Sequence, residues 1–188
     1  MSERNTIVRS MHDIGLAAWF GGSLMGVVGV NGGAAKAKDP TERLRLAGIG
    51  WARWAPVQLA AIAVHGIGGV GLVIGNKGRL AAQGEARTNS VLKVVVTAAA
   101  GAASVAAGLA GAKILQSSDE GAEGVTEPGA STSDGLATAQ RAEKVLQWAI
   151  PLLTGVLLVL SAQQGEQQRS AAGWAESLGK RAKQVIGH

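Results

Sequence analysis

The chain has 188 residues, of which 16% are charged, and it contains 28 glycines, one phenylalanine, no tyrosine and no cysteine. Without cysteine there is no disulfide framework, no thiolate metal site and no cysteine nucleophile. The net charge of +5 comes from basic residues that lie beside apolar segments rather than in one patch with aromatic side chains, which favours anionic lipid headgroups over nucleic acid as their partner.

Four segments contain no charged residue, and each is about as long as the ~20 residues that a helix needs to cross a ~30 Å hydrocarbon layer. These segments are residues 14–35, 54–76, 94–112 and 145–165. They predict an all-α fold, an integral membrane four-helix bundle within residues 1–165 whose helix interfaces are rich in Gly and Ala. The lipid bilayer is then the first partner of the chain.

The first segment has glycines at alternating three- and four-residue steps, a spacing that places them along one line of a helix. Within lipid, helices associate through close contact of small residues and through interhelical hydrogen bonds, because burial of apolar surface gives no gain there. The GxxxG spacing of Gly22 with Gly26 and of Gly29 with Gly33 therefore predicts tight packing against a neighbouring helix.

The second segment repeats this pattern around Gly68, and Gly71 with Gly75 forms a further GxxxG pair. It also carries Gln58 and His65, two helical turns apart on the same side. Polar side chains inside a membrane are costly and are candidates for function. In one interpretation His65 is a packing histidine; in the other it relays protons or binds a ligand or a metal. The candidate partners of a packing His65 are a backbone carbonyl and the hydroxyls of Thr97, Ser104 and Thr154.

The pair of His12 and His65 raises a further alternative, axial ligation of a haem between facing helices. His12 lies just before the first uncharged segment, whereas His65 is central in the second. At 1.5 Å per residue this predicts a separation of roughly 10 to 15 Å along the membrane normal, too far for one iron. We therefore predict no cofactor and no metal site. The sequence also lacks the GxSxG, Walker and HExxH motifs of enzymes.

The third segment carries Ser104 and Gly108 at the same small-residue spacing. Such seams serve either packing within one bundle or self-association between copies, and we expect the bundle. The helix-packing positions predicted on this basis are Gly15, Gly22, Gly26, Gly29, Gly33, Gly68, Gly71, Gly75, Ser104 and Gly108.

The connection at about 116–139 is acidic and rich in Gly, Ser and Thr, with too little apolar content to fold, so that we predict disorder there. The fourth segment, by contrast, is rich in leucine. Residues 166–188 repeat apolar residues at three- and four-residue steps among basic ones. This pattern predicts either an amphipathic helix on the membrane surface or an unstructured basic tail.

Lys and Arg are more frequent in the N-terminus, the second connection and the tail than in the first and third connections. Because basic residues stay on the cytoplasmic side, this distribution predicts that both termini are cytoplasmic and that the acidic connection lies outside. The expected location is the inner (cytoplasmic) membrane of a bacterium.

The run HDIGLAAWFGG, from His12 to Gly22, resembles the start of four-helix membrane domains of the copper-resistance D type, and His65 matches the histidine of their second helix. The resemblance implies a compact helical bundle and an association with a metal or redox group. The methionine and cysteine ligands that copper transport requires are missing, since the three methionines are Met1, Met11 and Met25. Only the fold is therefore carried over.

Three functional hypotheses follow. The leading one is a non-enzymatic structural or accessory protein that packs against a membrane-protein partner or a second copy through its glycine seams. The alternative is a transporter or permeation-related protein that uses Gln58 and His65, and it requires a water-filled cavity around these two side chains. The third is a haem or metal redox protein, which a Soret band would identify.

Overall fold

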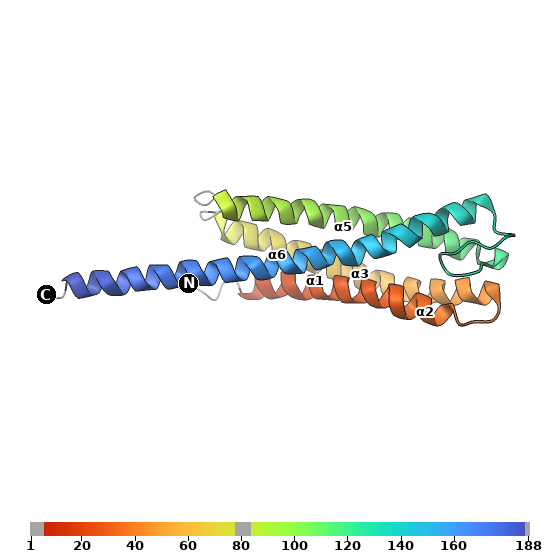
Figure 1. The fold of residues 1–188 in the computed structure, drawn as a ribbon, viewed down its shortest axis with the longest axis horizontal. Helices are drawn as coiled ribbons and strands as arrows, with labels where there is room; N and C mark the ends of the chain where they lie inside the picture. The colour runs from red at the N-terminus through yellow and green to blue at the C-terminus, as the bar shows by residue number, and fades with distance from the viewer. Residues whose placement is uncertain (1–5, 78–83, 187–188) are drawn as a thin grey trace.

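The computed structural model describes the backbone of residues 6–77 and 84–186, and the side chains of this part except 85–86 and 166–186. All regular elements in the described part are helices (Figure 1). Four stretches there are long and apolar enough to cross a membrane, namely Thr6–Ala34, Pro40–Gly75, Arg87–Gln116 and Asp134–Gly165. The prediction of an all-helical chain with four candidate membrane spans is thus confirmed.

The first of these stretches contains a π-helical turn. It consists of α1 (Thr6–Met25), the turn η2 (Gly26–Val30) and α2 (Asn31–Ala34). At the end of η2 the backbone N–H of Asn31 donates to the carbonyl of Gly26, five residues back. The wider turn inserts one residue into the helical repeat, which rotates the following residues by about 100° relative to α1.

The other long helices are α3 (Pro40–Gly75), α5 (Gly84–Gln116) and α6 (Asp134–Ile186), and a short 3-10 helix, η3 (Ser118–Glu120), follows α5. All three start before their uncharged segments, since charged residues are tolerated where a helix leaves the hydrocarbon. The carboxylate of Asp39 caps α3 by accepting hydrogen bonds from the amide and the hydroxyl of Thr41, both at 2.8 Å. These hydrogen bonds hold the pKa of Asp39 below its usual value.

The four long helices form a ring: α1 contacts α3 and α6, and α5 contacts the same two helices. Helices that follow one another in the chain run antiparallel, so the start of α1, the end of α3 and the start of α5 share one end of the molecule (Figure 1). Large apolar side chains point outward: Leu59, Leu109 and Leu152 are 67%, 70% and 68% exposed. Apolar surface of this extent is unusual on a soluble monomer.

The backbones of α1 and α3 meet at two glycines. A Cβ atom on Gly15 would lie 2.6 Å from the carbonyl oxygen of Ala61, and one on Gly68 would lie 2.6 Å from the carbonyl oxygen of Val8. Any larger residue at these positions would force the two backbones apart. Glycine is therefore what allows this crossing.

Further seam positions contact larger side chains. Gly22 lies against the indole of Trp54, Gly26 lies against that of Trp51, and Gly71 lies against the side chain of Val8. Ser104 of α5 accepts a hydrogen bond from the indole N–H of Trp19 at 3.2 Å, which links α5 to α1. Gly75 is the last residue of α3.

Three predicted packing glycines meet no neighbouring helix. A Cβ atom on Gly33 or Gly108 would find nothing within 4 Å, and one on Gly29 would meet only Met25 of its own stretch. Gly29 lies within the π-helical turn and Gly33 follows it, so both lie where the helix departs from the rotation that α1 keeps against α3.

Asn31, the first residue after the π-helical turn, forms hydrogen bonds to two neighbouring helices. The indole N–H of Trp51 donates to Oδ1 of Asn31 at 2.8 Å, and Nδ2 of Asn31 donates to Oε1 of Gln147 at 2.6 Å. One amide side chain thus joins the first stretch to both α3 and α6, and interhelical hydrogen bonds of this kind stabilise helix packing in lipid.

The connection between α5 and α6 lies over the end of the bundle, where side chains of α3 and α6 donate hydrogen bonds to it, and the disorder of about 116–139 stays a prediction. The guanidinium of Arg43 in α3 donates to the carbonyls of Ala122 and Glu123, at 3.3 and 2.7 Å. The side-chain amide of Gln140 in α6 donates to two more carbonyls of the connection, each at 3.1 Å. The composition of the connection does not predict these contacts, because the donors come from distant helices rather than from the connection itself.

The helix α6 continues without a break to Ile186 and extends past the ends of the other helices (Figure 1). The backbone of the predicted tail, 166–188, is therefore helical up to that residue. Its side chains lie outside the described residues, so that its contact with the membrane surface stays a prediction.

Candidate ligand site at the His12 and His65 pair

The crossing of α1 and α3 brings two histidines into contact. Gly15 lies against the backbone of His65, and Gly68 lies against the backbone of His12. The imidazole rings have their centroids 4.2 Å apart and their planes tilted by 40°. Both residues are buried, with 6% of His12 and 2% of His65 exposed.

The predicted separation of roughly 10 to 15 Å between these histidines along the membrane normal is wrong. That prediction used the uncharged segments to mark depth, but α1 already starts at Thr6 and the glycine crossing fixes its register against α3. His12 lies opposite Gly68, only three residues along α3 from His65. Three residues correspond to about 4.5 Å of helix.

Both ring nitrogens of His65 have hydrogen-bond partners. Nδ1 lies 2.9 Å from the carbonyl oxygen of His12, and Nε2 lies 3.4 Å from Oγ1 of Thr97. Because a carbonyl oxygen only accepts, Nδ1 carries the proton, and Nε2 accepts from the Thr97 hydroxyl. Two of the predicted partners, a backbone carbonyl and Thr97, are confirmed, whereas Ser104 and Thr154 make their hydrogen bonds elsewhere.

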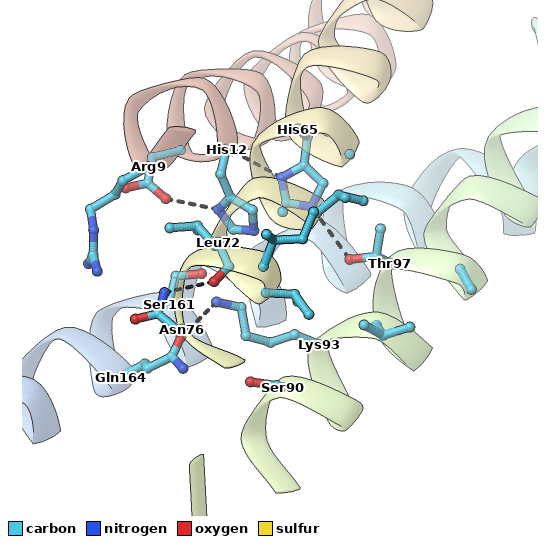
Figure 2. A pocket seen from close by; sticks show the side chains of 18 residues that line it. Arg9, His12, His65, Leu72, Asn76, Ser90, Lys93, Thr97, Ser161 and Gln164 are labelled. Atoms are coloured by element: carbon cyan, nitrogen blue, oxygen red, sulfur yellow. Dashed lines mark hydrogen bonds and ion pairs between the residues drawn. The ribbon is translucent and has the colours of Figure 1, made fainter. Parts of the chain in front are cut away.

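His12 is oriented by the residue that follows it. Nδ1 of His12 lies 3.0 Å from Oδ1 of Asp13, whose side chain is 54% exposed. A carboxylate only accepts, so Nδ1 of the neutral ring is the donor and Nε2 keeps its lone pair. Figure 2 shows this second nitrogen directed toward the side chains around the adjacent cavity.

A cavity of about 480 Å³ adjoins the histidine pair, between α1, α3, α5 and α6 (Figure 2). Its apolar wall comes from α3 and α5 and includes Val70, Val73, Ile74, Val94 and Ala98. Besides the histidines, the polar lining includes Arg9, Asp13, Lys93, Thr97, Ser161 and Gln164. The cavity is thus lined both by apolar side chains and by polar and charged ones.

Lys93 reaches from α5 toward α6, where Nζ donates to Oε1 of Gln164 at 3.1 Å (Figure 2). The side chain is half-buried, and its partner is a neutral amide. One turn before Gln164, the hydroxyl of Ser161 is buried and has no hydrogen-bond partner among the described residues. Two described lining residues, Arg9 and Lys93, are cations and one, Asp13, is an anion, so their net charge is positive.

Sequence reasoning identified His12 and His65 but missed Lys93, Ser161 and Gln164. The available signal was that Lys93 and Gln164 lie at the edges of two uncharged segments, which an antiparallel arrangement places at the same membrane face. Gln58 was expected to act with His65. It is half-buried and does not line the cavity.

The histidine pair does not fit the axial positions of one haem. Axial ligands approach the iron from opposite faces of the porphyrin, whereas these tilted rings contact each other directly, with centroids 4.2 Å apart. Within residues 6–77 and 84–165, whose side chains are mostly described, no group of three or more His, Cys, Asp or Glu is arranged to hold a metal ion.

Comparison of the chain with family models, with curated proteins and with solved structures gives no match. The resemblance of residues 12–22 to copper-resistance D-type domains therefore stays a prediction about the fold.

Proposed function

We propose that the protein is a small accessory membrane protein, without catalytic activity, that binds one amphipathic molecule in the cavity beside His12 and His65. The observation that carries this proposal is the cavity itself, whose volume of about 480 Å³ lies in the range of small-molecule sites. Such sites combine mainly apolar walls with a few polar groups that orient the ligand. His12, whose Nε2 keeps its lone pair, is a polar group of this kind.

The glycine seam supports a ligand-binding role over the binding of a membrane-protein partner. Contacts within the chain already occupy Gly15, Gly22, Gly26 and Gly68. A partner or a second copy is left with uncovered small residues such as Gly108 of α5. Permeation is less well supported, because the cavity beside His65 does not include Gln58.

We further propose that the protein resides in the bacterial cytoplasmic membrane with both termini inside. The cavity then opens at the level of the cytoplasmic leaflet, because it lies at the end of the bundle where α1 starts and α3 ends. The greater number of basic residues in the segments at that end supports this orientation.

Gly66→Leu tests whether the cavity holds a ligand. Gly66 lines the cavity, and a Cβ atom there would meet nothing within 4 Å, so that leucine fills cavity space without displacing the backbone. We expect native mass spectrometry of protein taken from phosphatidylcholine and phosphatidylglycerol vesicles to find one lipid on the unaltered protein. Gly66→Leu should reduce this retained fraction about tenfold, a loss of about 1.4 kcal/mol.

The matched control is Gly21→Leu. Gly21 is also exposed on a helix and a Cβ atom there would meet nothing within 4 Å, but it does not line the cavity. Gly21→Leu should retain lipid as the unaltered protein does. Equal retention by both leucine variants, or the absence of any retained molecule on the unaltered protein, would contradict the proposed function.

A further inference from the structure

We infer that the ligand is an acidic amphiphile, an acyl chain that ends in a phosphate or a carboxylate, with its anionic oxygens at Lys93. This inference rests on the proposed function, because it assigns a chemical class to the molecule in the same cavity. Its three supports are the environment of Lys93, the donors around it and the shape of the apolar wall.

The first support is the incomplete set of partners around the Lys93 ammonium. Of its three N–H donors, one reaches Oε1 of Gln164, and in the described part of the chain Lys93 forms no ion pair. A charge that is partly removed from water is costly unless an opposite charge accompanies it. An anionic oxygen in the cavity would complete the coordination of Lys93.

The second support is a further donor on the same side of the cavity. The hydroxyl of Ser161 is buried and lacks a hydrogen-bond partner among the described residues, and Ser161 lies one helical turn from Gln164. Charge-assisted hydrogen bonds to an oxyanion are stronger than those to a neutral acceptor. A head group with several anionic oxygens therefore suits Lys93 and Ser161 together.

The carboxylate of Asp13 also lines the cavity and repels an anion. Its Oδ1 already accepts a hydrogen bond from His12, which offsets part of its negative charge. Arg9 adds a second cation to the lining. We therefore place the head group at Lys93 rather than beside Asp13.

The third support is the apolar wall, which continues onto the outer surface of the bundle. Val70, Ile74 and Val94 line the cavity, and yet they are 61%, 65% and 61% exposed. In a bilayer, the outer surface of α3 and α5 faces acyl chains. A head group in the cavity can thus keep its chain in the hydrocarbon along these residues.

Vesicles that contain equal amounts of phosphatidylglycerol and phosphatidylcholine test the charge of the head group. We expect native mass spectrometry to find phosphatidylglycerol at least about tenfold in excess on the unaltered protein, the scale of one hydrogen bond to a charged group. Lys93→Gln should remove most of this preference. Lys93→Arg should keep it, and so should Lys113→Gln, which removes a lysine from the far end of α5.

A second arm distinguishes the two sources of an acyl anion. Oleate is added to the same vesicles. Displacement of the bound phosphatidylglycerol by oleate identifies a free fatty acid as the preferred ligand, whereas retention of phosphatidylglycerol identifies the phospholipid. Either result supports an acidic amphiphile. Lys93→Gln is compared only if its melting temperature matches that of Lys113→Gln. If the two melting temperatures differ, the ratio of phosphatidylglycerol to phosphatidylcholine on the unaltered protein decides whether the ligand is acidic.

The outcomes separate this inference from the proposed function. Equal retention of phosphatidylcholine and phosphatidylglycerol, with loss of both in Gly66→Leu, would overturn the acidic ligand and leave the cavity as a binding site. An unchanged preference in a folded Lys93→Gln would overturn the role of Lys93. Absence of every lipid and of oleate from the unaltered protein would overturn both proposals.

Discussion

Two glycines determine how close His12 and His65 come. Because Gly15 and Gly68 have no Cβ, α1 and α3 approach until the carbonyl of His12 reaches the ring of His65. Because a histidine side chain is short, its hydrogen bond to a backbone carbonyl of the neighbouring helix depends on this approach. The geometry of the histidine pair is thus set by two residues that do not line the cavity.

Gly68→Ala should therefore destabilise the protein. A Cβ atom at this position would lie 2.6 Å from the carbonyl oxygen of Val8, and backbone cannot yield as a side chain does. Overpacking of this kind costs about 1 to 3 kcal/mol. Thermal unfolding in detergent should show that Gly68→Ala lowers the melting temperature relative to the unaltered protein. Gly101→Ala should not lower it, because a Cβ atom there meets nothing within 4 Å. Equal melting temperatures for the two variants would mean that the crossing is looser than described.

At the scale of elements, the connection between α5 and α6 shows what one side chain contributes to a segment of low apolar content. Arg43 donates to carbonyls of the preceding turn, those of Ala37 and Lys38, and to carbonyls of the connection, those of Ala122 and Glu123. One planar guanidinium therefore holds together two segments that are distant in the sequence.

Arg43→Met should release the connection while the bundle stays folded. Loss of hydrogen bonds to a charged group costs about 1.5 to 3 kcal/mol, so amide exchange in residues 121–133 should become roughly ten- to a hundredfold faster. Hydrogen-exchange mass spectrometry measures this change, with the amides of 61–72 as an internal control. Exchange that is already unprotected in the unaltered protein would favour the disorder that composition predicts.

Helix number was predictable because charges are excluded from hydrocarbon and the chain therefore segregates them. The register of the helices was not predictable, because an uncharged segment fixes neither the ends of a helix nor its rotation relative to its neighbours. Two consequences are visible: His12 and His65 meet instead of lying at different depths, and Gly29 and Gly33, within and after the π-helical turn, lie off the seam. Lys93 shows the same effect, since it lies outside the uncharged segment 94–112 and yet within α5.

At the scale of the whole molecule, the ends of the bundle differ in character. One end carries the cavity and its two cations, and the other is closed by the connection that Arg43 holds. Which end faces the cytoplasm decides at the level of which leaflet the cavity lies.

The absence of cysteine permits a direct test of orientation by single cysteines. Thr88 lies near the cavity end and Ser131 lies in the α5–α6 connection, and both are exposed. With cytoplasmic termini, a membrane-impermeant maleimide added to intact spheroplasts should label Ser131→Cys and spare Thr88→Cys, and inside-out vesicles should give the opposite pattern. Labelling of Thr88→Cys in spheroplasts would place the cavity in the outer leaflet.

The uninterrupted course of α6 links the cavity to the far end of the chain. Gln164, the partner of Lys93, belongs to the same helix that runs on to Ile186, 22 residues further. A helical segment of 22 residues is about 33 Å long. Because Gln164 is fixed to this helix, any rotation of α6 about its own axis moves the amide relative to the ammonium of Lys93.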